Sequence, residues 1–221
     1  MAGPGALDLA SLKRDVAEDT TAGPARLDAI ERQVRSVLAD RVPGDLMECG
    51  VWRGGAALVM RAVLEATGDR ERSVWLADSF AGPPPPDPAA FPEDAGARWW
   101  AYPSMGAPRE AVEETFSRHG LLDDRVRFLS GWFRDTLPGT VGTLALLRID
   151  AALYESTFLA LEHLYPRLSA GGVVVVVHER MARCRRAVED FRADHGIAEP
   201  VESEDPGVVY WRRATVAGCG H

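Results

Sequence analysis

Side chains that can move protons follow several of the buried strands that the sequence predicts. Asp78, Asp150 and His178 close the predicted strands 73–78, 143–150 and 173–178. Ligands of open α/β sheets bind at the carboxyl ends of the strands. An unperturbed histidine has a pKa of about 6.5, which suits a general base near neutral pH. A carboxylate beside it would orient the ring and stabilise its charged form, so Asp150 and His178 are candidates for proton transfer.

A glycine-rich turn follows the first predicted strand, 45–50. Its residues run Glu48-Cys-Gly50-Val-Trp52-Arg-Gly-Gly55, a G-x-x-x-G-G order, and a helix follows. Glycine permits a tight turn and a close approach of a ligand to the backbone. The order differs from the G-x-G-x-x-G of dinucleotide-binding proteins, and no P-loop lysine follows. The turn therefore favours a cofactor that has no pyrophosphate.

Two further features at strand ends suit the same cofactor. Asp78 and Ser79 follow the second strand, where an acidic residue accepts hydrogen bonds from ribose hydroxyls in nucleotide-binding folds. Gly131 and Trp132 follow the third strand, and the indole offers a flat face for an adenine ring. Each feature alone is weak, but the three occur in order.

The elements that must position these residues alternate along the chain. Strands are predicted over 45–50, 73–78, 126–129, 143–150, 173–178 and 208–213, and helices over 53–66, 109–119, 155–168 (closed by Gly171-Gly172) and 184–195. Alternating, nearly continuous apolar strands predict a doubly wound, mostly parallel α/β sheet with helices on both faces. The last strand is a candidate for an antiparallel edge. We expect a helical arm over 1–41, one domain over 42–213 and a tail over 214–221.

The irregular stretch 81–108 is longer than a compact domain usually tolerates without a purpose. It contains four consecutive prolines, 83–86, and the pair Trp99-Trp100. We interpret residues 80–108 as a lid over the active site, and the alternative is a proline-stiffened surface loop.

Composition bounds the partners. A net charge of -8 argues against a broad phosphate-backbone contact, so nucleic acid is not expected. The three cysteines are odd in number and widely spaced, which fits neither a disulfide framework nor zinc-ligand pairs. No signal peptide or membrane span is evident, and we expect a cytoplasmic protein.

The sequences of several segments resemble those of the macrocin O-methyltransferase family, whose members methylate sugar hydroxyls on macrolides and related natural products. The segments are 42–46 (VPGDL), 50–55 (GVWRGG), 77–80 (ADSF), 131–137 (GWFRDTL), 154–157 (YEST) and 184–191 (CRRAVEDF). The resemblance implies a Rossmann-like class I methyltransferase fold, S-adenosylmethionine as cofactor, a small-molecule acceptor and a possible homodimer. The expected cofactor site comprises Glu48, Gly50, Trp52, Asp78, Ser79, Gly131, Trp132 and Asp150.

The chain departs from the family pattern where that pattern holds magnesium. The family has Asp-Gly-Asp after the fourth strand, and this chain has Asp150-Ala151-Ala152. The family has two aspartates and a tyrosine after the fifth strand, and this chain has Val177, His178 and Glu179. Magnesium prefers octahedral oxygen coordination, so we expect metal-independent catalysis and assign no metal ligand.

Three catalytic interpretations follow. His178, oriented by Asp150, is the candidate general base, although it could merely cap its strand. Glu179 is a second candidate base. A rebuilt transition-metal site from Asp150, His178 and Glu179 is the third.

We expect methylation, at oxygen, of a secondary-metabolite intermediate, either a sugar or a polyketide-type antibiotic precursor. The alternatives are a repurposed fold that catalyses cyclisation or elimination, and a non-catalytic accessory protein. Tyr154 is a candidate for the acceptor pocket, and Glu155 is expected to act on the helix dipole.

Overall fold

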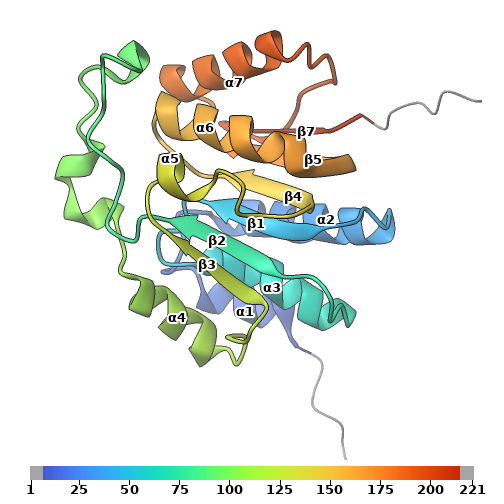
Figure 1. Ribbon diagram of the computed structural model, residues 1–221. Coiled ribbons are helices and arrows are strands. Elements are labelled where there is room, and N and C mark those ends of the chain that lie inside the picture. Colours follow the sequence, from blue (N-terminus) through green and yellow to red (C-terminus); the bar gives the residue numbers. More distant parts are fainter. Residues whose placement is uncertain (1–6, 215–221) are drawn as a thin grey trace, which may run out of the picture.

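The computed structural model describes residues 7–214 and is built around a seven-stranded sheet (Figure 1). The strand order is β3-β2-β1-β4-β5-β7-β6. Neighbours from β3 to β5 pair in parallel, whereas β7 is antiparallel to β5 and β6 is antiparallel to β7. The strands are β1 (Asp45–Cys49), β2 (Val74–Asp78), β3 (Val126–Ser130), β4 (Leu144–Ile149), β5 (Leu168–Val177), β6 (Glu202–Asp205) and β7 (Val208–Arg212).

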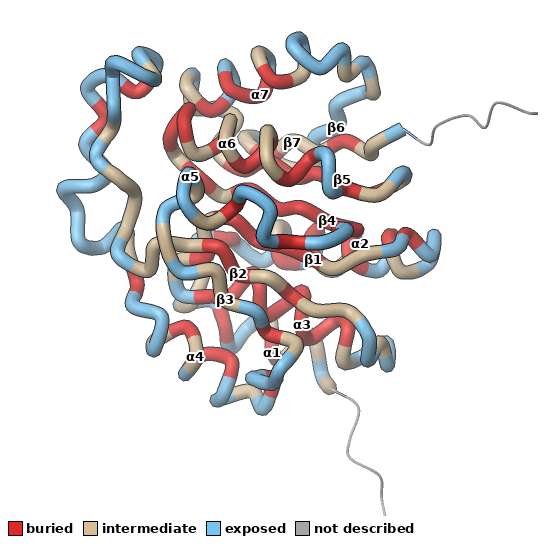
Figure 2. Tube along the Cα trace, in the orientation of Figure 1, coloured by how far each residue is buried: buried red, intermediate tan, exposed pale blue. Residues whose placement is uncertain are grey.

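Helices cover both faces of the sheet, as the alternating pattern predicts. One buried cluster joins a sheet face to α1 (Leu9–Asp15), α2 (Pro24–Ala39), α3 (Gly55–Thr67) and α4 (Arg109–Arg118). The other joins the opposite face to α5 (Phe133–Thr136), α6 (Tyr154–Leu164) and α7 (Ala182–Asp194). Figure 2 shows the central strands β1 and β4 and most of β5 as buried, whereas β3 is largely intermediate or exposed. Within residues 7–214, no helix has the length and apolar character needed to cross a bilayer.

The valine run of β5 shows why the central strands are apolar throughout. Val173, Val175 and Val177 pack into the cluster with α1–α4. Val174 and Val176 pack into the other cluster. Side chains of a strand alternate between its two faces, so a strand that is covered on both faces needs apolar residues at every position.

The antiparallel edge contains two strands, and the sequence predicted only the inner one, β7. The outermost strand, β6, carries Glu202, Ser203 and Asp205, whose polar side chains hid it. The expected helix end at Gly171-Gly172 was wrong. α6 ends at Leu164, and a 3-10 turn over Tyr165–Arg167 contains Pro166, which has no N–H to continue a helix. β5 begins directly afterwards at Leu168, so both glycines lie inside a strand.

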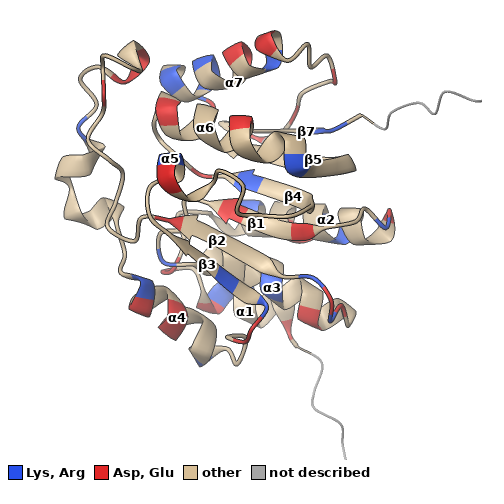
Figure 3. Cartoon of the chain, in the orientation of Figure 1, with Lys and Arg blue, Asp and Glu red and all other residues tan. Residues whose placement is uncertain are grey.

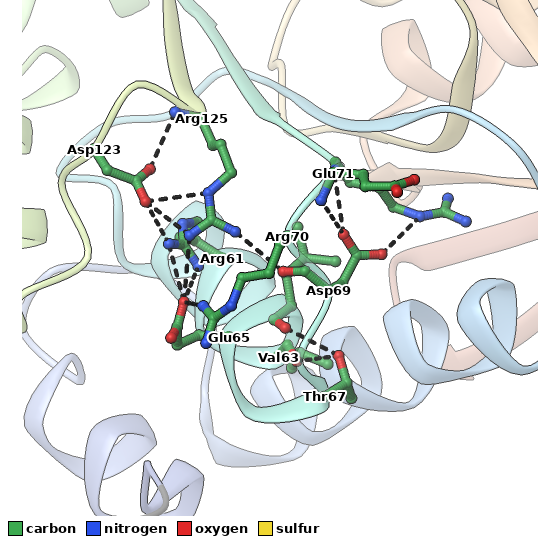
Figure 4. Close-up of polar contacts among 11 residues, drawn as sticks. Arg61, Val63, Glu65, Thr67, Asp69, Arg70, Glu71, Asp123 and Arg125 are labelled. Atoms are coloured by element: carbon green, nitrogen blue, oxygen red, sulfur yellow. Dashed lines mark hydrogen bonds and ion pairs between the residues drawn. The ribbon is translucent and has the colours of Figure 1, made fainter. Parts of the chain in front are cut away.

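An ion-pair network lies at the end of the sheet where β3 begins (Figure 4). Arg61, buried on α3, contacts Glu65 at 3.1 Å and Asp123 at 2.7 Å. Arg125 pairs with the same two carboxylates, and Arg70 adds a contact to Glu65. Hydrogen bonds from Arg70 and Arg61 lower the pKa of Glu65 to about 2. Partial burial opposes the same effect at Asp123, but Arg61 and Arg125 lower its pKa to about 2.

Other charges lie mainly on outer helix surfaces. Figure 3 shows acidic and basic residues interspersed along α4 and α7. Pairs such as Arg109–Glu113 and Arg186–Asp190 are four residues apart and lie at 2.8 and 2.7 Å. These pairs support the helices without forming a surface of one sign.

Candidate active site

A cavity of about 420 Å³ lies at the carboxyl ends of the parallel strands. The chain direction switches between β1 and β4, which is where open α/β sheets form a crevice. The volume lies in the range of small-molecule sites. The cavity is lined by these residues of the expected site: Glu48, Gly50, Trp52, Asp78, Ser79, Gly131, Trp132, Asp150 and His178. Glu179 is not among the lining residues; its Oε1 lies 3.3 Å from Nε of Arg185.

The turn after β1 is held by its neighbours rather than by glycine flexibility alone. Gly50 has a φ of +87°, and a Cβ there would lie 2.1 Å from the carbonyl oxygen of Asp150. The glycine therefore permits close packing of the β1 and β4 ends. Asp78 accepts hydrogen bonds from the backbone N–H of Val51 at 2.7 Å and of Trp52 at 3.2 Å. Its carboxylate thus connects the turn to the end of β2.

Three non-glycine residues at strand ends adopt left-handed backbone conformations. Trp52, Phe80 and His178 have φ values of 49°, 55° and 66° and follow β1, β2 and β5. Such conformations are costly and cluster at functional sites. Trp52 and His178 line the cavity, whereas Phe80 packs against the cluster formed with α1–α4.

Trp132 precedes α5 and remains 43% exposed although it lines the cavity. Its ring is therefore available to a ligand. Ser79, at the end of the neighbouring strand β2, donates its hydroxyl to the carbonyl of Gly82 and so fixes the start of the long connection after β2.

A chain of four charged or polar side chains crosses the crevice from β1 to β5. Glu48 and Arg148 are direct neighbours in the register of β1 and β4, and Arg148 Nη1 donates to Glu48 Oε1. Nη2 of Arg148 donates to Oδ2 of Asp150 at 2.9 Å. Nε2 of His178 lies 2.8 Å from Oδ1 of Asp150. Oε2 of Glu48 is buried and has no hydrogen-bond partner.

The charges of this chain set the protonation of its carboxylates. Burial opposes ionisation of Asp150, but Arg148 and the hydrogen bond from His178 lower its pKa to about 2. Burial raises the pKa of Glu48 to about 7, against the lowering effect of Arg148. Because Asp150 is ionised at neutral pH, it accepts a hydrogen from Nε2 of His178. This tautomer leaves the lone pair of Nδ1 available.

The residues at the β4 and β5 ends do not fit a magnesium ion. Both oxygens of Asp150 are engaged, by Arg148 and by His178. Val177, at a position that the family pattern gives to an aspartate, is 2% exposed and packs into the core. Among residues 7–214, no group of three or more His, Cys, Asp or Glu side chains is placed to hold a metal. Glu179 does not join Asp150 and His178 to rebuild a site.

Sequence reasoning overlooked Arg148, Arg134 and the site position of Glu155. Arg148 interrupts an otherwise apolar strand, and a buried arginine requires an anionic partner, so its presence in β4 was a usable signal. Glu155, expected to favour the helix dipole, lines the cavity and contacts Arg134. Thr20 and Thr21, between α1 and α2, also line it, and no local pattern indicates this.

The connection after β2 contributes directly to the cavity wall. Gly82, Pro83, Trp99 and Met105 line it. The segment contains 3-10 turns at Pro92–Asp94, Trp99–Ala101 and Pro103–Met105 and projects beyond the sheet at the left of Figure 1.

Two contacts attach this connection to the site. Asp94, fully buried, accepts hydrogen bonds from the N–H groups of Tyr154 at 2.8 Å and Glu155 at 2.9 Å. Nε1 of Trp52 donates to the carbonyl of Ser104 at 3.0 Å. The acid that caps α6 is therefore Asp94, which lies sixty residues away in the chain.

Cys49 and Cys184 are free and buried. Burial raises the pKa of both thiols, to about 11 for Cys184. Neither is poised as a nucleophile. Cys219 lies outside the described residues.

Comparisons with known proteins agree with this architecture. The model of the macrocin-O-methyltransferase (TylF) family matches residues 11–213. A Streptomyces olivaceus 8-demethyl-8-(2,3-dimethoxy-alpha-L-rhamnosyl)-tetracenomycin-C 4'-O-methyltransferase is 48% identical over 200 residues, covering 90% of this chain and 77% of that protein. A Micromonospora griseorubida mycinamicin III 3''-O-methyltransferase is 44% identical over 199 residues, covering 88% and 78%.

Solved structures share the fold. The O-methyltransferase NovP has a TM-score of 0.86 at 42% identity, covering 89% of this chain and 83% of that chain. The calicheamicin methyltransferase CalS11 has a TM-score of 0.70 at 20% identity, covering 96% and 98%. The second likeness concerns the fold alone.

Proposed function

Because the chain belongs to the macrocin-O-methyltransferase (TylF) family, we propose that this O-methyltransferase acts on a sugar hydroxyl of a glycosylated secondary metabolite, with His178 as general base. The observation that carries the proposal is the Arg148–Asp150–His178 chain at the cavity, in which Asp150 engages Nε2 of His178, so that Nδ1 is the acceptor nitrogen of a neutral ring. The relatives' named substrates, a rhamnosyl tetracenomycin and a mycinamicin, support the acceptor class.

The donor site lies over β1, β2 and β3. S-adenosylmethionine, when bound, supplies a methyl group on a sulfonium centre that an acceptor oxygen can attack. The unpartnered Oε2 of Glu48 suits the donor's ammonium group, because a buried carboxylate oxygen needs a hydrogen-bond donor. Trp132 offers its exposed face to the adenine. Asp78 already accepts backbone hydrogens, so ribose hydroxyls would share its remaining lone pairs.

Proton removal falls to His178. Its Nε2–H points at Asp150, so Nδ1 accepts the acceptor hydroxyl's proton as the methyl group is transferred. Asp150 stabilises the imidazolium that forms, and Arg148 keeps Asp150 ionised. Positioned general bases contribute about 10²–10⁴-fold to rate. We route no step through a metal, because the residues at the strand ends do not fit one.

Calorimetric titration with S-adenosylmethionine and S-adenosylhomocysteine, in EDTA and in added magnesium, tests the donor site. We expect micromolar binding in both conditions, and absence of binding in both would favour an accessory protein. The mass of the acceptor product then separates methyl transfer, which adds one methyl group, from a rearrangement, which adds none.

The variant His178→Gln tests the base. Its turnover should fall about 10²–10⁴-fold with donor affinity retained. His163→Gln, a change on α6 outside the cavity lining, is the matched control. Turnover by His178→Gln within a factor of three of the control would remove His178 from the mechanism, and turnover abolished by EDTA and restored by magnesium would replace the metal-free proposal.

A further inference from the structure

Glu155 is a buried acidic residue that the proposed proton transfer does not use. It lies in the first turn of α6, which follows β4 after a short link, and only 2% of the residue is exposed. It lines the cavity together with Ala151 and Ala152 from the same strand end. Glu155 therefore lies on the β4 side of the crevice, whereas the donor residues lie over β1, β2 and β3.

The carboxylate of Glu155 has most of its hydrogen-bonding capacity unused. Oε1 lies 2.6 Å from Nη2 of Arg134, and Oε2 is buried without a partner. A carboxylate has about four acceptor positions, and leaving them empty in a buried site is unfavourable. Burial raises the pKa of Glu155, against the lowering effect of Arg134, and the charge of Asp94 acts in the same direction as burial.

The position of this side chain is nevertheless well determined. Asp94 accepts the backbone hydrogen of Glu155 at 2.9 Å, and Arg134 holds the carboxylate from α5. Of the other carboxylates in the cavity, Asp78 binds backbone N–H groups and Asp150 binds Arg148 and His178. Glu48 also has an unpartnered oxygen, but it lies in β1 on the donor side. On the β4 side of the crevice, where we place the acceptor, Glu155 is thus the carboxylate that still has an oxygen without a hydrogen-bond donor.

We propose that Glu155 accepts a hydrogen bond from a second hydroxyl of the acceptor, next to the hydroxyl whose proton passes to His178. This inference rests on the proposed function and specifies the acceptor as a sugar with neighbouring free hydroxyls. A buried group that is built to pair with a hydroxyl discriminates strongly against an analogue that lacks it, because the protein group is then left unpaired.

The stability of the variants separates this role from a structural one. Glu155→Gln keeps the shape but removes a buried, partly unsatisfied charge. The melting temperature should therefore stay equal or rise, while recognition of the second hydroxyl weakens. Glu162→Gln, on the same helix but 42% exposed and outside the cavity lining, is the matched control. A structural role predicts instead that Glu155→Gln and Glu155→Ala lower the melting temperature.

The recognition experiment uses phenyl α-L-rhamnopyranoside and its 2-deoxy, 3-deoxy and 4-deoxy analogues as acceptors. The analogue that lacks the methylated hydroxyl has no oxygen to accept the methyl group and should give no product. With one of the other two analogues, we expect the unaltered enzyme to lose about 10- to 150-fold in kcat/KM, the range for a hydrogen bond to a charged group. Glu155→Ala should lose a similar factor with the parent glycoside and nothing further with that analogue. Glu162→Gln should behave as the unaltered enzyme.

Three results would overturn the inference. If Glu155→Ala still discriminates against the same analogue, another residue reads the hydroxyl, and the proposed function stands. If the unaltered enzyme methylates both analogues that keep the reacting hydroxyl as fast as the parent glycoside, no second hydroxyl is read. If it neither methylates nor binds any rhamnoside in the presence of S-adenosylhomocysteine, the glycoside acceptor itself fails, and the inference fails with it.

Discussion

Replacing Asp150 by asparagine would test how the charged chain sets the tautomer of His178. The carboxylate now accepts two hydrogen bonds, from Arg148 at Oδ2 and from His178 at Oδ1. An asparagine has one oxygen and one amide nitrogen. Arg148 is a buried cation with five N–H donors and no acceptor, so the amide oxygen must turn towards it. The amide N–H₂ then faces Nε2 of His178.

A donor at this place reverses the tautomer of the imidazole. Nε2 becomes the acceptor, and the proton moves to Nδ1, the atom that we propose takes the hydroxyl proton. The equivalent carboxylate-to-amide change in a serine-protease triad lowers kcat by about 10⁴ through the wrong tautomer. We expect a loss of about 10³–10⁴ in kcat here, because the geometry of the hydrogen bond is similar.

The same change should cost stability. Arg148 loses the stronger of its neutralising partners and keeps Glu48, which shares its register position. The amide oxygen still accepts a hydrogen bond from Arg148, but it no longer carries the charge that pairs with the guanidinium, which should cost about 1.5–3 kcal/mol. The Asp150→Asn variant should therefore unfold at lower denaturant concentration, but it should still bind S-adenosylmethionine, whose proposed contacts lie over β1, β2 and β3.

Single-turnover rates, followed by the mass of the methylated product, isolate the chemical step from binding. Donor affinity by calorimetry and the denaturant midpoint serve as controls. A kcat within tenfold of the unaltered enzyme, with the variant folded, would refute the tautomer argument. A loss of donor affinity as large as the loss of rate would show that Asp150 acts on the cofactor instead.

Three further changes test other parts of the structure. Burial raises the pKa of Glu48 to about 7, so pairing with the donor's ammonium should release a proton. Affinity for S-adenosylmethionine should therefore fall below pH 7. Glu48→Gln should abolish this pH dependence in calorimetry at pH 6, 7 and 8. The pKa values of Glu65 and Asp123 are lowered to about 2, so their ion pairs stabilise the fold above about pH 4.5, and that stability is lost as the pH falls towards 2. Glu65→Gln should reduce the acid dependence of the unfolding free energy by about 1 kcal/mol. An unchanged pH profile of that free energy would contradict the role of the network. Asp94→Ala removes the carboxylate that accepts two N–H groups of α6, which should lower the free energy of unfolding by about 1 kcal/mol. It should also raise the KM for the acceptor substrate more than the Kd for the donor. An unchanged KM would mean that the connection after β2 does not shape the acceptor site.

The sequence predicted the sheet and its two-sided cover because those features are local patterns. Continuous apolar strands such as 173–177 and glycine turns such as 50–55 can be recognised from the local sequence, because their patterns do not depend on neighbouring segments. The outer strand β6 was missed for the same reason, because Glu202, Ser203 and Asp205 are polar and give it no apolar period.

The cavity lining depends on contacts between distant segments, and there the sequence was a weaker guide. Asp94 caps a helix sixty residues away, and Thr20 reaches the site from between two amino-terminal helices. Nothing in the spacing of these residues indicates that they meet. The sequence predicted that Asp78 binds a ribose, and the structure adds hydrogen bonds from the backbone of the neighbouring turn to its carboxylate.

Arg148 is the residue that links fold and chemistry in this site. It lies in a strand that is buried at every position, and its two partners are the acids that end β1 and follow β4. A divalent cation at Asp150 would have to displace this guanidinium and the imidazole of His178 together, while the valine beside His178 offers no compensating oxygen. We infer that the chain keeps the family's fold and donor site but performs its proton transfer with a histidine whose orientation depends on a buried arginine. Catalysis therefore depends on the electrostatics of β4. Neutralising Asp150 should lower both the rate and the stability, whereas neutralising Glu155 should weaken recognition of the acceptor without lowering the stability.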